Sequence, residues 1–390
     1  MMTHRLTVGV AGVLMAVLIG QVRADDEPMF RHDVGRSAAE QARLAAEAKA
    51  LAEAAQKRYG PGYTTKIDDQ RHIVYVSALD AYTFSRAVGM LETFSDQQRQ
   101  MLFREPLPWN VTVILPTLSD YRKPQATASF EGHYERATRT LESLSLSDVL
   151  YHEFTHALHH ADEVQGNQRH PVWIREGLAC LLQQWVMREG KLEVLPGRDL
   201  AVLQEAVRNR KVHPFAALFA MDQEAFFRDA DLCYAESHYI MFYLNQLGKL
   251  REFYENYKAG YAADPAGGAA LVKTLGKPLD EIESDWREWV LRQNVPWTPA
   301  HPPKARLGIK MEAVPEGVKI TGFVRGSAAE RAGQLKFGDI VLSVAGQGAG
   351  TPGDLTAAVQ TCQPGQTIDI EVIRDGQLTL VRQLLGVTSP

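Results

Sequence analysis

The segment YHEFTHALHH, residues 151–160, contains four of the 12 histidines in the 390-residue chain. Within it, His152, Glu153 and His156 form the pattern H-E-x-x-H. Residues four positions apart lie on one face of a helix, so both imidazoles can reach one ion. Neutral imidazoles suit zinc, and a carboxylate beside them can take a proton from water in an open position. The spacing therefore predicts a hydrolytic zinc centre, with a chance pattern on a surface helix as the alternative.

A third ligand must come from outside this helix. Glu176, in the segment WIREGLA, lies 20 residues after His156 on the next expected helix. Two antiparallel helices joined by the loop at 161–171 can place it beside the two histidines, which leaves one coordination position for water. Its apolar neighbours indicate a buried helix, where an unpaired glutamate would be costly. Asp162 is a rival ligand, but a ligand at that spacing needs a helix break where this chain has His159.

The other two histidines of the segment are expected to have different environments. His159 projects onto nearly the same stripe as His152, but it lies about 10 Å further along the helix axis. That distance is too long for one ion to bind His152, His156 and His159 together. We expect His159 to support a ligand from behind or to face the substrate, with a helix end in solvent as the alternative, and His160 to lie on the surface.

A strand-containing lobe precedes the histidine segment. Residues 36–58 are rich in alanine and free of helix breakers, which predicts a helix with one exposed face. Runs rich in β-branched residues and bounded by turn residues predict strands at 72–78 and 110–116. Apolar residues at helical spacing lie between these two runs. Residues 127–144 are expected to form short strands broken at Gly132.

From Ser145 onward, apolar residues recur at helical spacing. The helix that carries the histidines is expected to be capped by Ser145 or Ser147. The helix that carries Glu176 is expected to have Pro171 in its first turn. The expected helices of this lobe are 147–161, 171–188, 215–227, 236–257 and 279–293. The predicted fold class is α+β: a small strand-containing lobe, a mainly helical lobe, and a separate strand-rich domain.

HEFTH followed by WIREGLA resembles the gluzincin metallopeptidases, especially the compact peptidase MA-like group of exported bacterial proteins. The resemblance covers roughly residues 70–295 and is strongest at 148–182. It implies a helical zincin lobe with one zinc ion and a glutamate general base. The implied ligands are His152, His156 and Glu176, and the implied base is Glu153.

Two further parts of a gluzincin site are less clear in this chain. Several gluzincins carry an aspartate one turn after the glutamate ligand, where it supports a ligand histidine, but this chain has Cys180 there. Gluzincins also stabilise the oxyanion with a tyrosine or histidine from a later helix. Tyr234 and His238 lie four apart on one expected helix, and similar proteins begin this helix with Tyr-Ala, which favours Tyr234. A core tyrosine and a capped histidine are the alternative.

The C-terminal segment resembles a bacterial PDZ domain of the kind found in exported proteases. The matching blocks are Leu307-Gly308-Ile309, the turn at 327–333, Gly338-Asp339-Ile340, and Pro364-Gly365 before a strand that ends in Arg374-Asp375-Gly376. The resemblance implies that a peptide binds by pairing with a strand of the domain.

In such a domain, the loop at Leu307, Gly308 and Ile309 holds a terminal carboxylate with its backbone N–H groups. The helix that begins near residue 354 then lines the side-chain pocket with Leu355 and Val359. The expected partner of this domain is therefore the C-terminus of a substrate or of another protein. The alternative is a domain that packs on the catalytic lobe and binds no free peptide.

Composition restricts the partners and the compartment. The net charge is −5 and there is no long basic run, so we expect no nucleic-acid partner. An apolar run of 15 residues, 6–20, followed by Val-Arg-Ala ending at Ala24 predicts a cleaved signal peptide, with an uncleaved anchor as the alternative. No second run is long enough for an integral membrane segment in the mature chain. We expect export to the periplasm or the medium, in which Cys180 and Cys233 either pair or stay reduced.

These observations predict five regions: a signal peptide at 1–24, a helical segment at 25–62, a gluzincin-like domain at 63–295, a proline-rich linker at 296–305 and a PDZ domain at 306–390. The expected function is that of an exported zinc peptidase acting on a peptide or protein. Two alternatives are a non-catalytic PDZ scaffold with a structural or vestigial zinc site, and an exopeptidase resembling glycyl aminopeptidases. The chain has no G-x-M-E-N element to hold a substrate amino terminus, which favours an endopeptidase.

Overall fold

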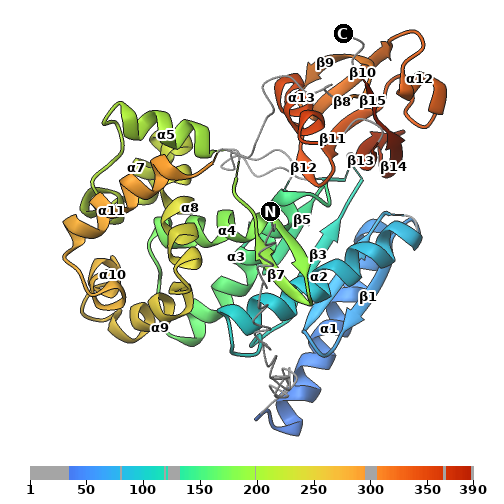
Figure 1. Cartoon of the computed structure of the whole chain (residues 1–390). Coiled ribbons are helices and arrows are strands. Elements are labelled where there is room, and N and C mark those ends of the chain that lie inside the picture. Colours follow the sequence, from blue (N-terminus) through green and yellow to red (C-terminus); the bar gives the residue numbers. More distant parts are fainter. Residues whose placement is uncertain are drawn as a thin grey trace, which may run out of the picture. The chain divides into compact units, whose positions relative to one another are not determined.

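The structure is a computed structural model, shown in Figure 1. It describes residues 35–79, 81–117, 120–121, 132–197, 199–294, 305–362 and 366–387. The expected signal peptide, the expected strand residues 127–131 and the linker residues 296–304 lie outside this set. The α+β fold class is confirmed. Among the described helices, none is long and apolar enough to span a membrane.

The N-terminal lobe is built on a five-stranded sheet with the strand order β1-β2-β3-β5-β4. Its strands are β1 (Thr64–Asp68), β2 (Ile73–Ser77), β3 (Val111–Leu115), β4 (Gly132–Glu135) and β5 (Thr140–Ser143). The expected strand–helix–strand start is confirmed by β2, α2 (Ala81–Met101) and β3, since β2 and β3 are parallel neighbours. Strand β4 begins at Gly132, the residue at which the strands of segment 127–144 were expected to break, and residues 127–131 lie outside the described set.

Two helices cover the two faces of this sheet. Helix α1 (Ala38–Tyr59) starts with a capping box between Ser37 and Glu40 and buries Ala48 against Val74 and Ile114. On the other face, apolar residues of α2 belong to the main core together with Ile73 and Val111. The alternation of side chains along each strand therefore divides the apolar residues between two clusters.

Strand β4 is the edge strand and pairs with β5 alone among the described strands. It lies alongside helix α3 (Asp148–Gln165). A Cβ atom on Gly132 would come within 2.9 Å of Cγ1 of Val149, in the first turn of α3. The hydroxyl of Tyr134 lies 2.9 Å from Nδ1 of His160, further along the same helix. Strand β4 and helix α3 therefore run in the same direction, with β4 beside the histidine segment.

Helix α4 (Val172–Gln183) follows α3 after a short loop, and Pro171 is its N-cap. The prediction that this helix continues to residue 188 was wrong. Strand β6 (Trp185–Arg188) pairs with β7 (Lys191–Val194) across a two-residue turn. Glu189 and Gly190 both have positive φ, of 51° and 76°, as a type I′ hairpin turn requires. The aromatic and β-branched residues that continue the helical pattern in the sequence therefore lie in this hairpin.

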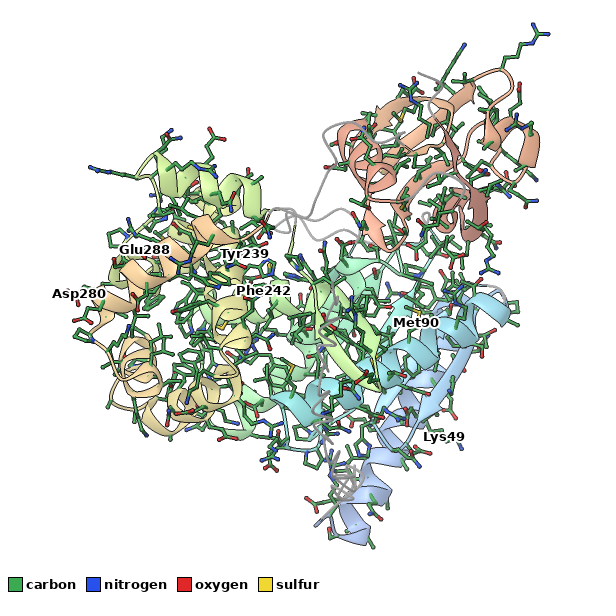
Figure 2. The ribbon with its side chains drawn as sticks, in the orientation of Figure 1. Lys49, Met90, Tyr239, Phe242, Asp280 and Glu288 are labelled. Carbon is green, nitrogen blue, oxygen red and sulfur yellow. The ribbon has the colours of Figure 1, made fainter. Side chains whose placement is uncertain are left out.

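Seven further helices complete the helical lobe: α5 (Leu200–Arg208), α6 (Phe215–Phe219), α7 (Gln223–Arg228), α8 (Ala230–Gln246), α9 (Leu250–Gly260), α10 (Gly268–Leu275) and α11 (Leu279–Arg292). The expected helix at 215–227 divides at Asp222, which caps α7, and the one at 236–257 divides at Gly248, whose φ is 67°. Figure 2 shows Tyr239 and Phe242 of α8 inside this lobe and Glu288 of α11 at its edge.

The C-terminal domain has a sheet with the strand order β14-β13-β11-β10-β9. Its strands are β8 (Ala305–Arg306), β9 (Ile309–Val314), β10 (Gly317–Phe323), β11 (Ile340–Val344), β12 (Gln347–Gly348), β13 (Thr367–Arg374), β14 (Gln377–Leu384) and β15 (Gly386–Val387), with helices α12 (Ala328–Ala332) and α13 (Pro352–Gln360). Strand β8 thus includes Ala305, the last residue of the linker expected from the sequence.

This domain contacts the start of the histidine helix. The carboxylate of Glu371 accepts a hydrogen bond from the backbone N–H of Leu146, at 3.0 and 2.9 Å from its two oxygens. The backbone N–H of Gly348 donates to Oδ1 of Asp148 at 3.2 Å. Leu342 belongs to the same apolar cluster as the core of the helical lobe. These contacts support one part of the expected alternative, namely that the C-terminal domain packs on the lobe that carries the histidine helix.

Candidate metal centre

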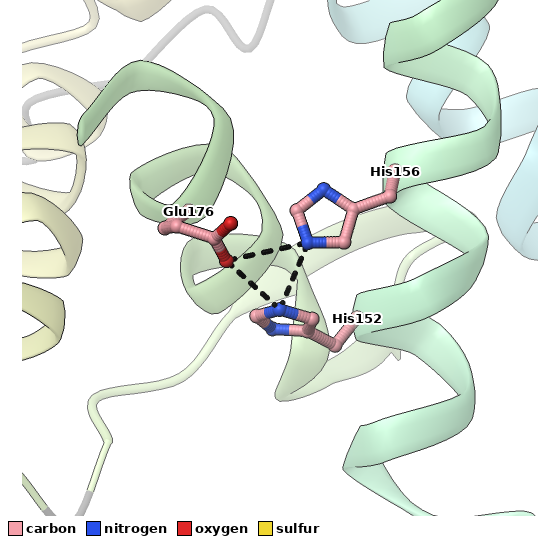
Figure 3. Close-up of side chains that lie close together, drawn as sticks. All are labelled: His152, His156 and Glu176. Atoms are coloured by element: carbon pink, nitrogen blue, oxygen red, sulfur yellow. Dashed lines mark hydrogen bonds and ion pairs between the residues drawn. The ribbon is translucent and has the colours of Figure 1, made fainter. Parts of the chain in front are cut away.

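The structure brings His152, His156 and Glu176 together at one point between α3 and α4 (Figure 3). Oε2 of Glu176 lies 3.3 Å from Nε2 of each histidine, and the two Nε2 atoms lie 3.1 Å apart. Ligand atoms about 2.0–2.2 Å from one zinc ion in a tetrahedron lie about 3.3–3.5 Å from one another. The three distances are thus close to those of three corners of such a tetrahedron.

The ring of His152 is oriented by Gln183. Oε1 of Gln183 lies 3.0 Å from Nδ1 of His152, so the carbonyl oxygen accepts the Nδ1–H hydrogen bond. The lone pair of Nε2 then points toward His156 and Glu176. The sequence did not reveal this partner, because a gluzincin carries its supporting aspartate at the position of Cys180. In this chain the Cys180 sulfur lies 3.9 Å from the same nitrogen, a weaker contact.

Three atoms that can act as acceptors converge here, an arrangement that fits a cation. Oε2 of Glu176 is buried without a hydrogen-bond donor, and one proton cannot bridge all three pairs of atoms. Burial disfavours ionisation of Glu176, but His156 and His152 outweigh it and lower the pKa of the carboxyl. Burial opposes protonation of His152, but Cys180 and Glu176 outweigh it and raise its pKa. Two imidazoles and one carboxylate that attract the same positive charge are a donor set that fits zinc.

Glu153 and Tyr234 lie at the same centre. Both line a cavity of about 1170 Å³, together with the three candidate ligands. Glu153 forms no hydrogen bond or ion pair with the described residues, and its charge acts on both His152 and Tyr234. Burial and the neighbouring Glu176 carboxylate raise the pKa of Tyr234 far above its ordinary value, so the phenol keeps its proton at neutral pH.

His238 is not at this centre. Its side chain is 1% exposed and does not line the cavity, and its Nδ1 lies 2.9 Å from Oδ2 of Asp199. Asp199 does line the cavity. His238 therefore lacks the access that an oxyanion donor requires, and this part of the expectation is corrected. The four-residue spacing indicated that His238 and Tyr234 share one face of α8. Because α8 is buried on nearly all sides, a shared face does not give His238 access to the cavity.

The positions of His159 and His160 also differ from expectation. His159 was expected to support the site or end the helix in solvent, yet it is 1% exposed and its Nε2 lies 2.7 Å from Nδ1 of His170. His160 was expected on the surface, but it is buried and bonded to the Tyr134 hydroxyl. Helix α3 continues to Gln165 and is covered by β4 and by α9, which the helix pattern alone does not show.

Two other groups of side chains have spacings that a metal ion could use among the described residues, namely His159, Glu163 and His170, and His213, Cys233 and Glu236. Both contain their own donors. Glu163 accepts from Arg136 and from the backbone of His170, and Glu236 accepts twice from His213. Neither group needs a cation.

The alternative of a disulfide between Cys180 and Cys233 is corrected, because both thiols are free and buried. Cys180 lies beside His152, whereas the Cys233 sulfur lies 3.7 Å from the sulfur of Met221. Burial raises the pKa of each thiol, so both are inert at neutral pH. The cysteines therefore act as small core residues.

The peptide-binding residues expected in the C-terminal domain lie together. Leu307, Leu355 and Val359 belong to its apolar core, and Ile309, the first residue of edge strand β9, packs against them. Gly308 has a φ of 77° in the loop before β9. Residues 305–383 match the PDZ domain family. This segment is a PDZ domain.

No curated protein matches this chain. Among solved structures, the HtrA-type protease AlgW with a tripeptide is 27% identical, over 22% of this chain and 33% of that one, with a TM-score of 0.21. An aminopeptidase N family protein from Idiomarina loihiensis is 13% identical, over 84% of this chain and 67% of that one, with a TM-score of 0.35. These TM-scores are too low to indicate a shared fold across whole chains. The chain spans about a third of the HtrA-type proteases that it matches.

Proposed function

We propose that this protein is an exported zinc-dependent peptidase whose PDZ domain binds the C-termini of substrates or partner proteins. The observation that carries the proposal is the cluster of three acceptor atoms 3.1–3.3 Å apart, which fits one zinc ion held by His152, His156 and Glu176. Zinc in such a site supplies Lewis acidity, which polarises a carbonyl group and lowers the pKa of a coordinated water.

The two remaining polar groups of the centre have complementary tasks. The Glu153 carboxylate has no competing partner among the described residues and accepts the proton of the attacking water, then returns it to the leaving amine. The Tyr234 hydroxyl donates a hydrogen bond to the oxygen on which negative charge develops. It keeps its proton for this task, because burial and Glu176 raise its pKa.

Strand β4 gives the substrate a place to bind. Its residues Gly132, His133 and Tyr134 line the same cavity as the metal centre, and its outer edge has no strand partner among the described residues. An extended peptide can therefore pair with this edge and pass over His152 and His156. This arrangement favours a peptide bond as the bond that is cleaved.

A pair of measurements tests this proposal. We expect the purified mature chain to bind close to one equivalent of zinc, measured by mass spectrometry of the metal. We expect Glu153→Gln to keep the zinc and to lose about 10²–10⁴-fold in peptidase activity, as for removal of a general base. Glu176→Gln should lose zinc and activity together. Absence of zinc after reconstitution, or full activity of Glu153→Gln, would refute the proposal.

Analysis of the products resolves the type of cleavage. An endopeptidase releases internal fragments from a peptide blocked at both ends, whereas an exopeptidase resembling glycyl aminopeptidases releases single residues and needs a free amino terminus. If zinc is bound but no peptide is cleaved, the alternative of a PDZ scaffold with a structural zinc site is favoured.

A further inference from the structure

The cavity over the metal centre has an unusual distribution of charge. Arg136, Arg169 and Arg175 all line it. Arg136 follows strand β4, Arg169 lies in the loop before α4, and Arg175 lies in the first turn of α4. These three arginines come from separate elements, yet they share one cavity with the candidate zinc ligands.

The contacts place these arginines at one end of the cavity. Strand β4 runs with α3, from the contact of Gly132 with Val149 to the ion pair of Arg136 with Glu163, at 2.6 Å. Helix α4 runs in the opposite direction, because its last residue, Gln183, bonds to His152. The start of α4 therefore lies beside the end of α3. Arg136 and the first turn of α4 thus lie together, beyond the metal centre.

The positive charge at this end is only partly neutralised. Glu163 is fully buried and pairs with Arg136. Arg169 and Arg175 form no ion pair with the described residues, and Nε of Arg175 is buried without a hydrogen-bond partner. The next carboxylate along the strand, Glu135, accepts from the backbone N–H of Ala137 and does not line the cavity. Of these three guanidinium groups, only that of Arg136 is paired with a carboxylate among the described residues.

The other basic residues near this end of the cavity, His159, His170 and Lys258, add no unpaired positive charge. Burial, reinforced by nearby cations, lowers the pKa of His170 to about 3 and holds that of His159 well below its ordinary value. Both imidazoles are neutral at pH 7. Lys258 is paired with Asp162 at 2.7 Å. The guanidinium groups of Arg169 and Arg175 are therefore the uncompensated charges.

Carboxylates lie toward the opposite end. Asp148, in the first turn of α3, and Asp199, which acts on the pKa of Cys180 in the second half of α4, both line the cavity. A third aspartate, Asp231 in the first turn of α8, also lines the cavity. The arginines lie toward the end of α3, and Asp148 and Asp199 lie toward its start, with the candidate metal centre between them. A peptide with a carboxylate on one side of the scissile bond matches this polarity.

We propose that Arg175 and Arg169 bind a carboxylate of the substrate, so that this protein prefers peptides that are anionic on one side of the cleaved bond. The inference rests on the proposed peptidase function and adds a substrate class to it. A guanidinium group binds a carboxylate in a planar, two-point geometry, which suits a C-terminal carboxylate or an acidic side chain equally.

Binding to the zinc-loaded Glu153→Gln variant tests this proposal without cleavage. Three fluorescent peptides of one sequence are compared by anisotropy: one with an internal glutamate and a free C-terminus, one with glutamine instead, and one with an amidated C-terminus. We expect the fully anionic peptide to bind about tenfold or more tightly than the peptide that lacks the recognised carboxylate. Loss on amidation identifies the C-terminal carboxylate only where Arg175→Gln or Arg169→Gln removes that loss, because a loss that persists in these variants comes from binding to the PDZ domain. Loss on the glutamine exchange identifies the side chain.

Substitution then locates the effect. Arg175→Gln and Arg169→Gln, each added to Glu153→Gln, should abolish most of this preference while zinc content stays constant. Arg292→Gln is the matched control, because Arg292 pairs with Glu288 on α11 and does not line the cavity. Equal affinity for all three peptides, or equal weakening of all three in the Arg175 and Arg169 variants, would overturn the proposal. Preferential binding without zinc-dependent cleavage would instead overturn only the proposed function.

Discussion

The hydrogen bond from His152 to Gln183 offers a sharp test of how the metal centre is oriented. Gln183→Ala removes the oxygen that lies 3.0 Å from Nδ1 and leaves His152 and the other two ligands unchanged. The ring is then free to rotate and to move its proton to Nε2, the atom that lies 3.1 Å from His156. We expect zinc affinity to fall about 10–100-fold, the usual effect of removing a group that holds a ligand histidine.

That loss corresponds to about 1.4–2.7 kcal/mol. A neutral hydrogen bond contributes about 0.5–1.5 kcal/mol, so roughly half of the expected loss comes from the bond itself and the rest from the freed ring. Gln183→Glu should hold or raise the affinity, because a carboxylate makes the histidine a stronger ligand. Zinc affinity is measured by competition with a coloured chelator at fixed pH.

Gln184 provides the control. It lines the same cavity one residue further along, but it makes no hydrogen bond to His152. Gln184→Ala should leave zinc affinity within about twofold of the parent. A Gln183→Ala protein with unchanged affinity, or an equal loss in both variants, would refute the view that Gln183 sets the tautomer of His152.

Tyr234→Phe should lower kcat about 10²–10³-fold and leave zinc content unchanged, since only the oxyanion donor is removed; an unchanged kcat would contradict this role. Gly177→Ala should destabilise the fold by several kcal/mol in chemical unfolding, because its Cβ would lie 2.7 Å from the carbonyl oxygen of Ser237. Burial raises the pKa of Glu371 to about 7, so the folded chain keeps a proton that the unfolded chain releases near pH 4.5, and stability should fall as pH rises between these values. Glu371→Gln should remove this part of the pH dependence, on the order of 3 kcal/mol, and an unchanged pH profile would count against it.

The candidate ligands could be predicted from the sequence because they depend on local geometry. The four-residue spacing of His152 and His156 fixes their shared face, and the short loop before α4 restricts Glu176 to the same side. Gln183 could not be predicted in this way. Which residue of α4 faces His152 depends on the rotation of α4 about its axis, and this rotation is set by its packing against α8 at Gly177.

The errors in the fold have a similar origin. In the sequence, residues 185–188 continue the helical pattern of apolar residues. In the structure they form a strand, because the tight turn at Glu189 and Gly190 lets them pair with β7. His160 looks polar and exposed in a helical projection, but β4 supplies Tyr134 as a bonding partner 26 positions away. In each case a pairing between distant segments overrides a local preference that is weak in free energy.

The spacing of the side chains does not distinguish the candidate metal centre from a hydrogen-bonded cluster. The hydrogen-bond donors around each group do. The ligand atoms of His159, Glu163 and His170 lie within 4.8 Å of one another, as those of His152, His156 and Glu176 do. There, Arg136 and the backbone N–H of His170 satisfy the carboxylate, so the group is complete without an ion. At His152 the outer nitrogen is already bonded to Gln183, and Oε2 of Glu176 is buried without a hydrogen-bond donor, so this group, unlike the other, fits a bound cation.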